Sequence, residues 1–170
     1  NQLIYGYNTD WIGIVKPLKN INEKKWSDTK VLILGAGGTA RAAIYGIKSL
    51  KCKQIYIFNR TIKKAKSLAS EFKCNYVENL NQITEIDIII STIPAEVNYT
   101  LPNEIINLKP IIFDVNYYPK ITALTQQAIN FNCKYVKGID MLIYQAIAQN
   151  KIWTKNEIDF DKIKNYLENL

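Results

Sequence analysis

The chain has 170 residues, of which 48% are hydrophobic and 11% aromatic, a composition that indicates one globular domain and excludes a disordered chain. It contains no histidine, which excludes Ser-His-Asp and Cys-His triads, histidine zinc sites and imidazole acid–base catalysis by this chain. The net charge of +7 comes from lysines spread along the chain, since only Arg41 and Arg60 are arginines. This pattern is typical of a solvated surface and speaks against nucleic-acid binding.

Apolar runs and helix-forming segments alternate in chain order. A helix over Tyr7–Leu18 and a polar loop over Lys19–Thr29 come first. The predicted strands are Lys30–Leu34, Gln54–Phe58, Asn75–Val77, Ile86–Ser91, Pro110–Val115 and Lys134–Val136. The remaining predicted helices are Thr39–Leu50, Ile62–Phe72 with Thr61 as N-cap, Thr122–Phe131, Ile139–Trp153, and Phe160–Leu170 with Asp159 or Asp161 as N-cap. Strands separated by helices predict an α/β fold, a Rossmann-like, doubly wound, mostly parallel sheet with helices on both faces.

Three scattered cysteines, Cys52, Cys74 and Cys133, form no Cys-x-x-Cys pair. Their odd number and wide spacing predict reduced thiols in a cytoplasmic compartment, and no metal site. No stretch of about 18 apolar residues is free of charge, so no membrane span is expected.

A glycine-rich turn, Gly35-Ala36-Gly37-Gly38-Thr39-Ala40, follows the first strand and opens a helix. Glycine at the first position permits a tight turn, and glycine at the third lets the backbone approach a pyrophosphate. The helix N-terminus then offers free N–H groups to the phosphates. The pattern favours dinucleotide binding over a turn without a ligand. It has no G-K-[ST] ending, which speaks against a P-loop nucleotidase.

The second strand ends at Asn59-Arg60-Thr61, where an NAD site usually offers a carboxylate to the ribose 2′-hydroxyl. A guanidinium instead suits a 2′-phosphate and can stack on adenine, and Lys64 adds a flexible positive charge. The sequence therefore favours NADP over NAD, with an unliganded surface arginine as the alternative. The role of Arg41, between helix positioning and direct contact, stays open.

Two further segments lie where a parallel sheet presents ligands, and a third comes before the first strand. Asp114–Pro119 ends a strand, and Gly138–Gln145 begins a helix after another strand. Tyr117 and Gly138 are thus placed to face a cofactor's reactive ring, and Gln145 to reach a polyol. The third segment, Asn8-Thr9-Asp10, is equally consistent with a helix start in which Thr9 or Asp10 is the cap.

Five segments in this order resemble the shikimate dehydrogenase family. The resemblance is strongest to the shikimate dehydrogenase part of the arom-type multifunctional polypeptide. They are Asn8–Gly13 (N-T-D-x-x-G), Gly35–Ala42 (G-A-G-G-x-A-R-A), Asn59–Thr61 (N-R-T), Asp114–Pro119 (D-x-x-Y-x-P) and Gly138–Gln145 (G-x-x-M-L-x-x-Q). The resemblance implies NADPH-dependent, reversible reduction of 3-dehydroshikimate to shikimate.

The resemblance also implies roles for individual residues. Asp10 is the expected catalytic residue, paired with a lysine. The expected substrate-binding residues are Asn8, Thr9, Asp10, Tyr117 and Gln145. The expected cofactor-binding residues are Gly35, Ala36, Gly37, Gly38, Thr39, Asn59, Arg60, Thr61, Lys64, Thr92, Ile93, Val115 and Gly138.

In the family the lysine belongs to a substrate domain upstream of the N-T-D segment. The resemblance therefore implies that residues 1–170 form the NADP-binding domain, with 1–29 as a hinge or linking segment. The helix within 155–170 is expected to pack toward the upstream substrate domain, and this chain alone to be inactive or nearly so. The alternatives are a quinate/shikimate dehydrogenase that uses NAD, and a catalytically inactive NADP-binding sensor.

Overall fold

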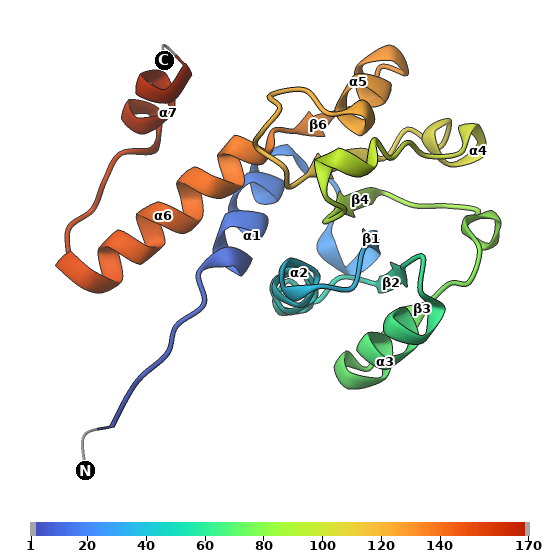
Figure 1. Ribbon diagram of the computed structural model, residues 1–170, viewed down its shortest axis with the longest axis horizontal. Coiled ribbons are helices and arrows are strands. Elements are labelled where there is room, and N and C mark those ends of the chain that lie inside the picture. Colours follow the sequence, from blue (N-terminus) through green and yellow to red (C-terminus); the bar gives the residue numbers. More distant parts are fainter. Residues whose placement is uncertain (1–2, 169–170) are drawn as a thin grey trace.

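Short runs of β-branched and other apolar residues pair into one sheet in the computed structural model, which describes residues 3–168 (Figure 1). All ladders are parallel, in the order β3-β2-β1-β4-β5-β6. The strands are β1 (Lys30–Leu34), β2 (Gln54–Phe58), β3 (Asn75–Tyr76), β4 (Ile88–Ser91), β5 (Ile111–Asp114) and β6 (Tyr135–Val136). The predicted α/β, doubly wound architecture is confirmed, and the strand order reverses between β1 and β4.

Seven α-helices and three short 3-10 helices join these strands in residues 3–168. They are α1 (Asp10–Ile21), η1 (Trp26–Asp28), α2 (Gly38–Ser49), α3 (Ile62–Phe72), η2 (Leu80–Gln82), η3 (Ala95–Val97), α4 (Asn103–Ile106), α5 (Ala123–Asn130), α6 (Gly138–Thr154) and α7 (Phe160–Glu168). The sequence predicted neither α4 nor the 3-10 helices, because one turn is too short to show a period.

One local prediction about the helices was wrong, and a second was confirmed only in part. The first helix begins at Asp10, not Tyr7, because the Asn8 side chain accepts a hydrogen bond from the Asp10 N–H at 3.0 Å. It then continues to Ile21, into the predicted loop. Thr61 occupies the N-cap position of α3, as predicted, but its side chain makes no cap hydrogen bond. Asp159 does act as predicted, since its Oδ1 accepts from the Lys162 N–H at 2.8 Å.

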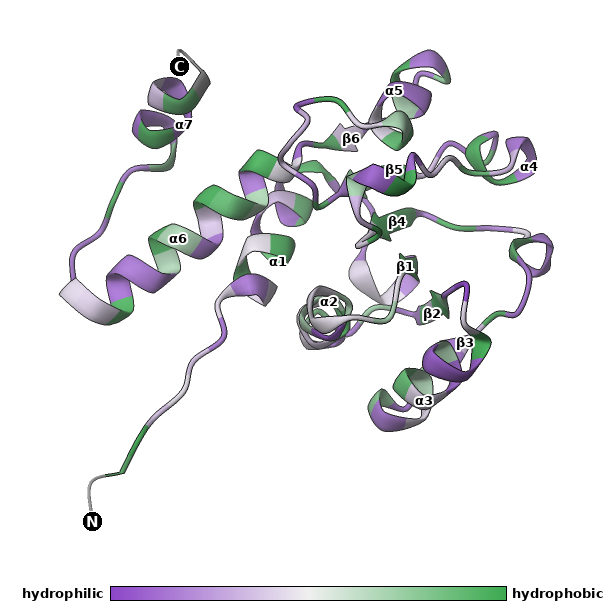
Figure 2. Ribbon diagram, viewed as in Figure 1, coloured by the Kyte–Doolittle hydropathy of each residue, from purple (hydrophilic) through white to green (hydrophobic). Residues whose placement is uncertain are grey.

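Alternation along the central strands divides the core between the two faces of the sheet. Val31 and Ile33 face one cluster with side chains of α1, α2, α3 and α6, whereas Leu32 and Leu34 face a second cluster with side chains of α4 and α5. Figure 2 shows hydrophobic strands surrounded by helices that carry both hydrophobic and hydrophilic residues. A strand buried on both faces reads as a continuous apolar run, which is why the sequence located these strands well.

The central strand β4 allows a direct test of this core. Ile90 is fully buried, and Ile90→Ala is expected to lower the free energy of unfolding by about 2–4 kcal/mol, because it removes buried methylene groups and leaves a cavity. Ile62→Ala, at a side chain that is 43% exposed, is the control and is expected to cost less than about 1 kcal/mol. Urea unfolding measures both, and equal effects would contradict the assigned core.

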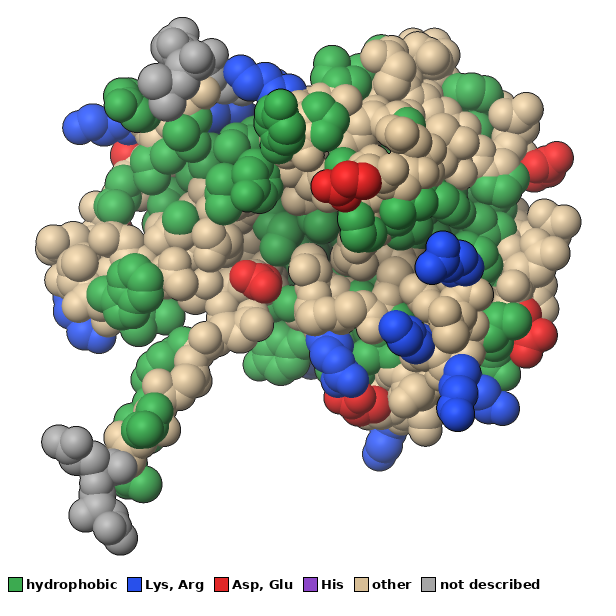
Figure 3. All heavy atoms as spheres, in the orientation of Figure 1, with side chains coloured by type: hydrophobic (Ala, Val, Ile, Leu, Met, Phe, Trp, Pro, Cys, Tyr) green, Lys and Arg blue, Asp and Glu red, His purple; other side chains and the backbone are tan. Residues whose placement is uncertain are grey.

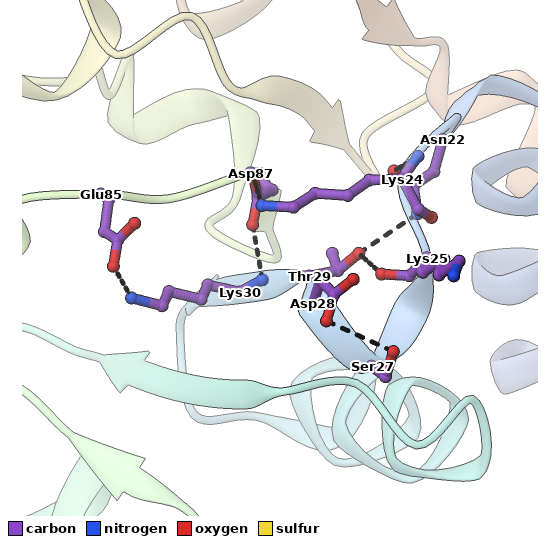
Figure 4. Close-up of polar contacts among 9 residues, drawn as sticks. All are labelled: Asn22, Lys24, Lys25, Ser27, Asp28, Thr29, Lys30, Glu85 and Asp87. Atoms are coloured by element: carbon purple, nitrogen blue, oxygen red, sulfur yellow. Dashed lines mark hydrogen bonds and ion pairs between the residues drawn. The ribbon is translucent and has the colours of Figure 1, made fainter.

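The segment between α1 and β1 is held to the start of β4 by polar contacts (Figure 4). The Asp87 carboxylate accepts from the Lys30 N–H at 2.7 Å and pairs with the Lys24 ammonium at 3.0 Å. Buried Thr29 donates to the Lys25 carbonyl at 2.8 Å. Residues 24–30 are thereby tied to the amino end of the sheet, while residues 3–8 extend away from the body (Figure 1).

The long helix α6 packs against α1 along one side and against α7 near its amino end. A Cβ on Gly13 would lie 2.5 Å from the Met141 carbonyl oxygen, so α1 and α6 approach closely at this glycine. Tyr144 stacks on Phe160 of α7 at 4.2 Å, and Lys164 pairs with Asp140 at 2.9 Å. No helix within residues 3–168 has the length and apolarity needed to cross a membrane.

The three cysteines are free thiols, and Cys133 is buried. Burial raises the pKa of the Cys52 thiol to about 11 and also raises the pKa values of Cys74 and Cys133. At pH 8, Cys52 is therefore expected to react with iodoacetamide about 100-fold more slowly in the native protein than in the urea-unfolded chain, because the thiolate is the reactive form. Mass spectrometry of the alkylated peptides measures the ratio, and equal rates would contradict the burial.

Candidate functional site

A cleft of about 610 Å³ opens at the carboxyl ends of β1, β2 and β4, where the strand order reverses. Doubly wound sheets bind ligands at such a switch point. The cleft brings together Gly35, Ala36, Gly37, Asn59, Arg60, Thr61, Lys64, Thr92 and Ile93, all predicted cofactor-binding residues. It is also lined by Phe58, Pro94, Val97 and Tyr99, which the sequence analysis missed because nothing in their local pattern distinguishes them from core or loop residues. The other four predicted residues, Gly38, Thr39, Val115 and Gly138, do not line it.

Gly35 fixes the floor of the cleft. Its φ is +110°, a conformation that favours glycine, and its N–H donates to the Phe58 carbonyl at 2.8 Å. A Cβ here would lie 2.2 Å from the Thr92 Oγ1, which itself donates to the Leu34 carbonyl at 2.8 Å. The loops after β1 and β4 therefore meet directly at Gly35.

The start of α2 forms an open cradle above this floor. A Cβ on Gly37 or Gly38 would meet no atom within 4 Å, and both residues are exposed. Ala40, one turn into the helix, is fully buried, so the helix packs closely on the sheet. First-turn N–H groups have no partner within a helix, and the helix dipole favours an anion there. The open space and these donors fit a pyrophosphate.

The rim of the cleft at the end of β2 is positively charged. Arg60 and Lys64 are exposed, and Lys and Arg side chains gather toward α3 in Figure 3. The Asn59 side chain donates to the Thr61 carbonyl at 3.1 Å, and the Thr61 hydroxyl is not used as a cap. No carboxylate lines the cleft among the described residues. The rim therefore offers cationic and neutral donors to an anionic group.

Arg41, whose role the sequence left open, contributes to a helix pair. Its guanidinium hydrogen-bonds to the Glu71 carboxylate, and this contact raises the pKa of Arg41. The contact joins the first turn of α2 to the end of α3 and does not involve the cleft.

A second group of predicted residues lies where α1 meets α6. The buried Thr9 hydroxyl donates to the Gln145 Oε1 at 3.3 Å, so two segments 136 residues apart come together. The segment is a helix start with Thr9 at the N-cap position of α1, as the alternative held, but the Thr9 side chain makes no cap hydrogen bond. The Asn8 side chain instead accepts from the Asp10 N–H. Within residues 3–168 the Asp10 carboxylate makes no hydrogen bond or ion pair. It is thus available to a group outside this part of the chain.

At the last residue of β5, where the following loop begins, lies a buried acid to which the sequence analysis assigned no role of its own. Asp114 is 4% exposed, and its Oδ2 accepts from the Thr122 hydroxyl at 2.6 Å. Its Oδ1 accepts from the N–H of Asn116 at 3.2 Å and from the Nδ2 of Asn116 at 2.6 Å. An acid at the end of a buried apolar run is the signal that could have found it, because buried carboxylates need donors.

Gly138 packs directly on this loop. A Cβ there would lie 2.0 Å from the Asn116 carbonyl oxygen and 2.9 Å from the Tyr117 nitrogen. Tyr117 is 56% exposed and borders a second hollow of about 440 Å³. Gly138 begins α6 and Gln145 lies two turns along it. One helix therefore holds an expected cofactor-binding residue and an expected substrate-binding residue. Within residues 3–168, no hydrogen bond joins Asp10 to Tyr117. The same residues contain no group of three His, Cys, Asp or Glu side chains that could hold a metal ion.

Comparison with known proteins agrees with this geometry. The sequence profile "Shikimate / quinate 5-dehydrogenase" matches residues 18–132. A shikimate dehydrogenase (NADP(+)) of Legionella pneumophila strain Lens is 39% identical over 158 residues, covering 90% of this chain and 58% of that protein. A pentafunctional AROM polypeptide of Kluyveromyces lactis is 35% identical, covering 93% of this chain and 11% of that protein.

One similar solved structure is the shikimate 5-dehydrogenase of Thermus thermophilus in complex with NADP(H) and shikimate. It superimposes with a TM-score of 0.75 at 26% identity, covering 92% of this chain and 60% of that one. The chain thus spans 58% of the length of the Legionella relative and 60% of the Thermus protein.

Proposed function

Because the chain belongs to the shikimate/quinate 5-dehydrogenase family, we propose that it binds NADP(H) as the cofactor domain of a shikimate dehydrogenase. The enzyme would reversibly reduce 3-dehydroshikimate to shikimate. The observation that carries this proposal is the cleft itself, with a glycine-rich floor, an open helix N-terminus and a rim that bears Arg60 and Lys64.

The charge of the rim supports NADP over NAD. A 2′-phosphate needs cationic donors, and the Arg60 guanidinium supplies planar donors that match phosphate oxygens. Thr61 adds a hydroxyl that α3 does not use. A carboxylate at this place would select the free 2′-hydroxyl and repel the phosphate. We place the adenosine half of the cofactor against this rim, which also argues against the NAD-dependent quinate/shikimate alternative.

The second group of residues supports a substrate site beside the cofactor. The chemistry that NADPH would supply when bound is the hydride for the keto carbon, and a proton must reach the carbonyl oxygen. In our proposal Asp10 forms the pair with a lysine that delivers this proton. Gln145, oriented by its contact with Thr9, and Tyr117 hold the hydroxyls of the substrate. A sensor that binds only the nucleotide needs none of these three residues, so they favour an enzyme over a sensor.

The lysine of this pair is assigned to an upstream substrate domain of the parent protein. The Asp10 carboxylate has no cationic partner within residues 3–168, and the stand-alone relatives are longer than this chain. On this proposal residues 1–170 are the NADP-binding domain, 1–29 link the two domains, and the helix within 155–170 packs toward the upstream domain. The reduced thiols are consistent with a cytoplasmic location.

Calorimetric titration of the chain with NADP⁺ and NAD⁺ tests the cofactor assignment. We expect NADP⁺ to bind at least about tenfold more tightly, the effect of one charge-assisted contact to the 2′-phosphate. We expect no shikimate-dependent NADPH formation by the chain alone. Failure to bind either nucleotide would overturn the proposal, and oxidation at a rate typical of the family would overturn the assignment of the lysine.

The role of Asp10 is tested in the parent protein. Asp10→Asn removes the carboxylate of the pair, so shikimate oxidation is expected to fall by about 100-fold or more. The dissociation constant for NADP⁺ is expected to stay within about twofold, because Asp10 does not line the cofactor cleft. Asp161→Asn, on α7, is the control. Full activity of Asp10→Asn would remove Asp10 from the mechanism.

A further inference from the structure

Two loops on the carboxyl edge of the sheet are joined by a single side chain. Asn116, in the loop after β5, uses its Nδ2 group twice, donating to the Asp114 Oδ1 at 2.6 Å and to the Ile93 carbonyl at 2.7 Å. Ile93 belongs to the loop after β4 and lines the cofactor cleft. An amide nitrogen carries two N–H groups, so both of them are satisfied by these two acceptors.

The buried carboxylate of Asp114 holds the Asn116 side chain in the orientation that reaches Ile93. Asp114 is 4% exposed and accepts from the Thr122 hydroxyl on its other oxygen, while that hydroxyl also accepts from the Thr125 N–H at the start of α5. A buried carboxylate that accepts several hydrogen bonds holds its donors strongly, because breaking them leaves the charge unsolvated. The Asn116 side chain therefore cannot turn away from Ile93 without losing its contact with this acid.

The backbone of the same residue fixes the neighbouring part of the site. The Asn116 N–H also donates to Asp114, and the Asn116 carbonyl packs on Gly138 so closely that a Cβ there would lie 2.0 Å away. The backbone between Val115 and Tyr117 is thus held against Asp114 on one side and Gly138 on the other. Ile93, Val115 and Gly138 are all expected cofactor-binding residues, and the sequence places Gly138, with Tyr117, facing the reactive ring of the cofactor. Because the proposed function assigns the adenosine half to the rim at Arg60, this part of the edge is left for the nicotinamide end.

We propose that Asn116, anchored by Asp114, is a positioning residue that sets how the nicotinamide end of NADP(H) is held. It acts through the Ile93 carbonyl on one side and through the Val115–Tyr117 backbone on the other. This inference rests on the proposed function, since it needs NADP(H) in the cleft. Asn116 itself is not assigned a contact with substrate.

The test compares NADPH with adenosine 2′,5′-bisphosphate, which carries only the adenosine half of the cofactor. Asn116→Asp keeps the shape of the side chain but replaces the donor with a carboxylate that faces Asp114 and the Ile93 carbonyl. It is expected to weaken NADPH binding about tenfold while leaving binding of the bisphosphate within about twofold. The fluorescence increase of bound NADPH, which reports the surroundings of the nicotinamide, is expected to shrink. Asn107→Asp, an exposed change at the end of α4, is the matched control.

A second variant keeps the inference testable if Asn116→Asp does not fold. Thr122→Val removes the hydroxyl donor to Asp114 and leaves Asn116 in place. It is expected to weaken NADPH binding relative to bisphosphate binding as well, but by less than Asn116→Asp does. Equal weakening of both ligands, or no change with either, would overturn the inference. Absence of NADPH binding by the unaltered chain would instead overturn the proposed function together with it.

Discussion

Replacing Arg60 with alanine is expected to weaken NADP⁺ binding by about 10- to 100-fold and to change NAD⁺ binding by less than about threefold. Arg60 is exposed at the end of β2, on the rim of the cleft to which the cofactor is assigned. Its guanidinium is assigned to the 2′-phosphate, which NAD⁺ lacks. Because the interaction joins opposite charges at a solvent-exposed site, the difference between the two nucleotides is also expected to decrease as salt is raised.

Two controls separate this effect from general electrostatics. Lys66→Ala removes a positive charge from α3 at a residue that does not line the cleft, and it is expected to leave the affinity for NADP⁺ nearly unchanged. Arg60→Lys retains the charge but not the planar donors, so an intermediate loss is expected. Calorimetry with both nucleotides measures these changes. Equal losses of NADP⁺ and NAD⁺ affinity in Arg60→Ala would contradict the assignment of the 2′-phosphate.

Two glycines of the same turn are expected to respond differently to alanine. Gly35→Ala places a Cβ 2.2 Å from the Thr92 Oγ1 in a backbone with φ of +110°, so both a clash and backbone strain result. The free energy of unfolding is expected to fall by about 2 kcal/mol or more. Moving the Thr92 side chain would relieve the clash but not the strain, and would break its hydrogen bond to the Leu34 carbonyl.

At Gly37 the protein leaves open space, and φ is −93°, which alanine adopts easily. Gly37→Ala is therefore expected to change the free energy of unfolding by less than about 1 kcal/mol. It is nevertheless expected to weaken NADP⁺ binding about tenfold or more, because the added methyl group occupies the space assigned to the pyrophosphate. Urea unfolding and calorimetry distinguish the two variants. A stable Gly37→Ala protein with unaltered affinity would show that the cradle does not hold the pyrophosphate.

The strands and the first part of the site could be predicted because their causes are local. Lys30–Leu34 reads as a buried strand from its own five residues, and the turn at Gly35 follows from chain geometry directly after it. Arg60 lies at the end of the next strand, so parallel pairing alone brings it to the same edge of the sheet. Residues whose position depends only on strand order and direction were therefore placed correctly by pattern.

Single turns and capping contacts were harder to predict. The α4 turn has only four residues, too few for a period. Thr61 is at the N-cap position of α3, but its side chain makes no cap hydrogen bond although its residue type suits that role. In each case the local sequence permits several conformations of similar energy, and packing against the rest of the chain selects one of them.

The sequence by itself determined the sheet, the glycine-rich turn and the charge at the rim of the cleft, because each depends on neighbours in the chain or on the direction of the strands. Only the tertiary structure decided that Thr9 bonds Gln145, that Asn116 bonds the Ile93 carbonyl, and that Gly138 lies against the loop after β5. These contacts join segments far apart in sequence, and their partners are fixed when helices and loops pack and buried polar groups must find donors or acceptors.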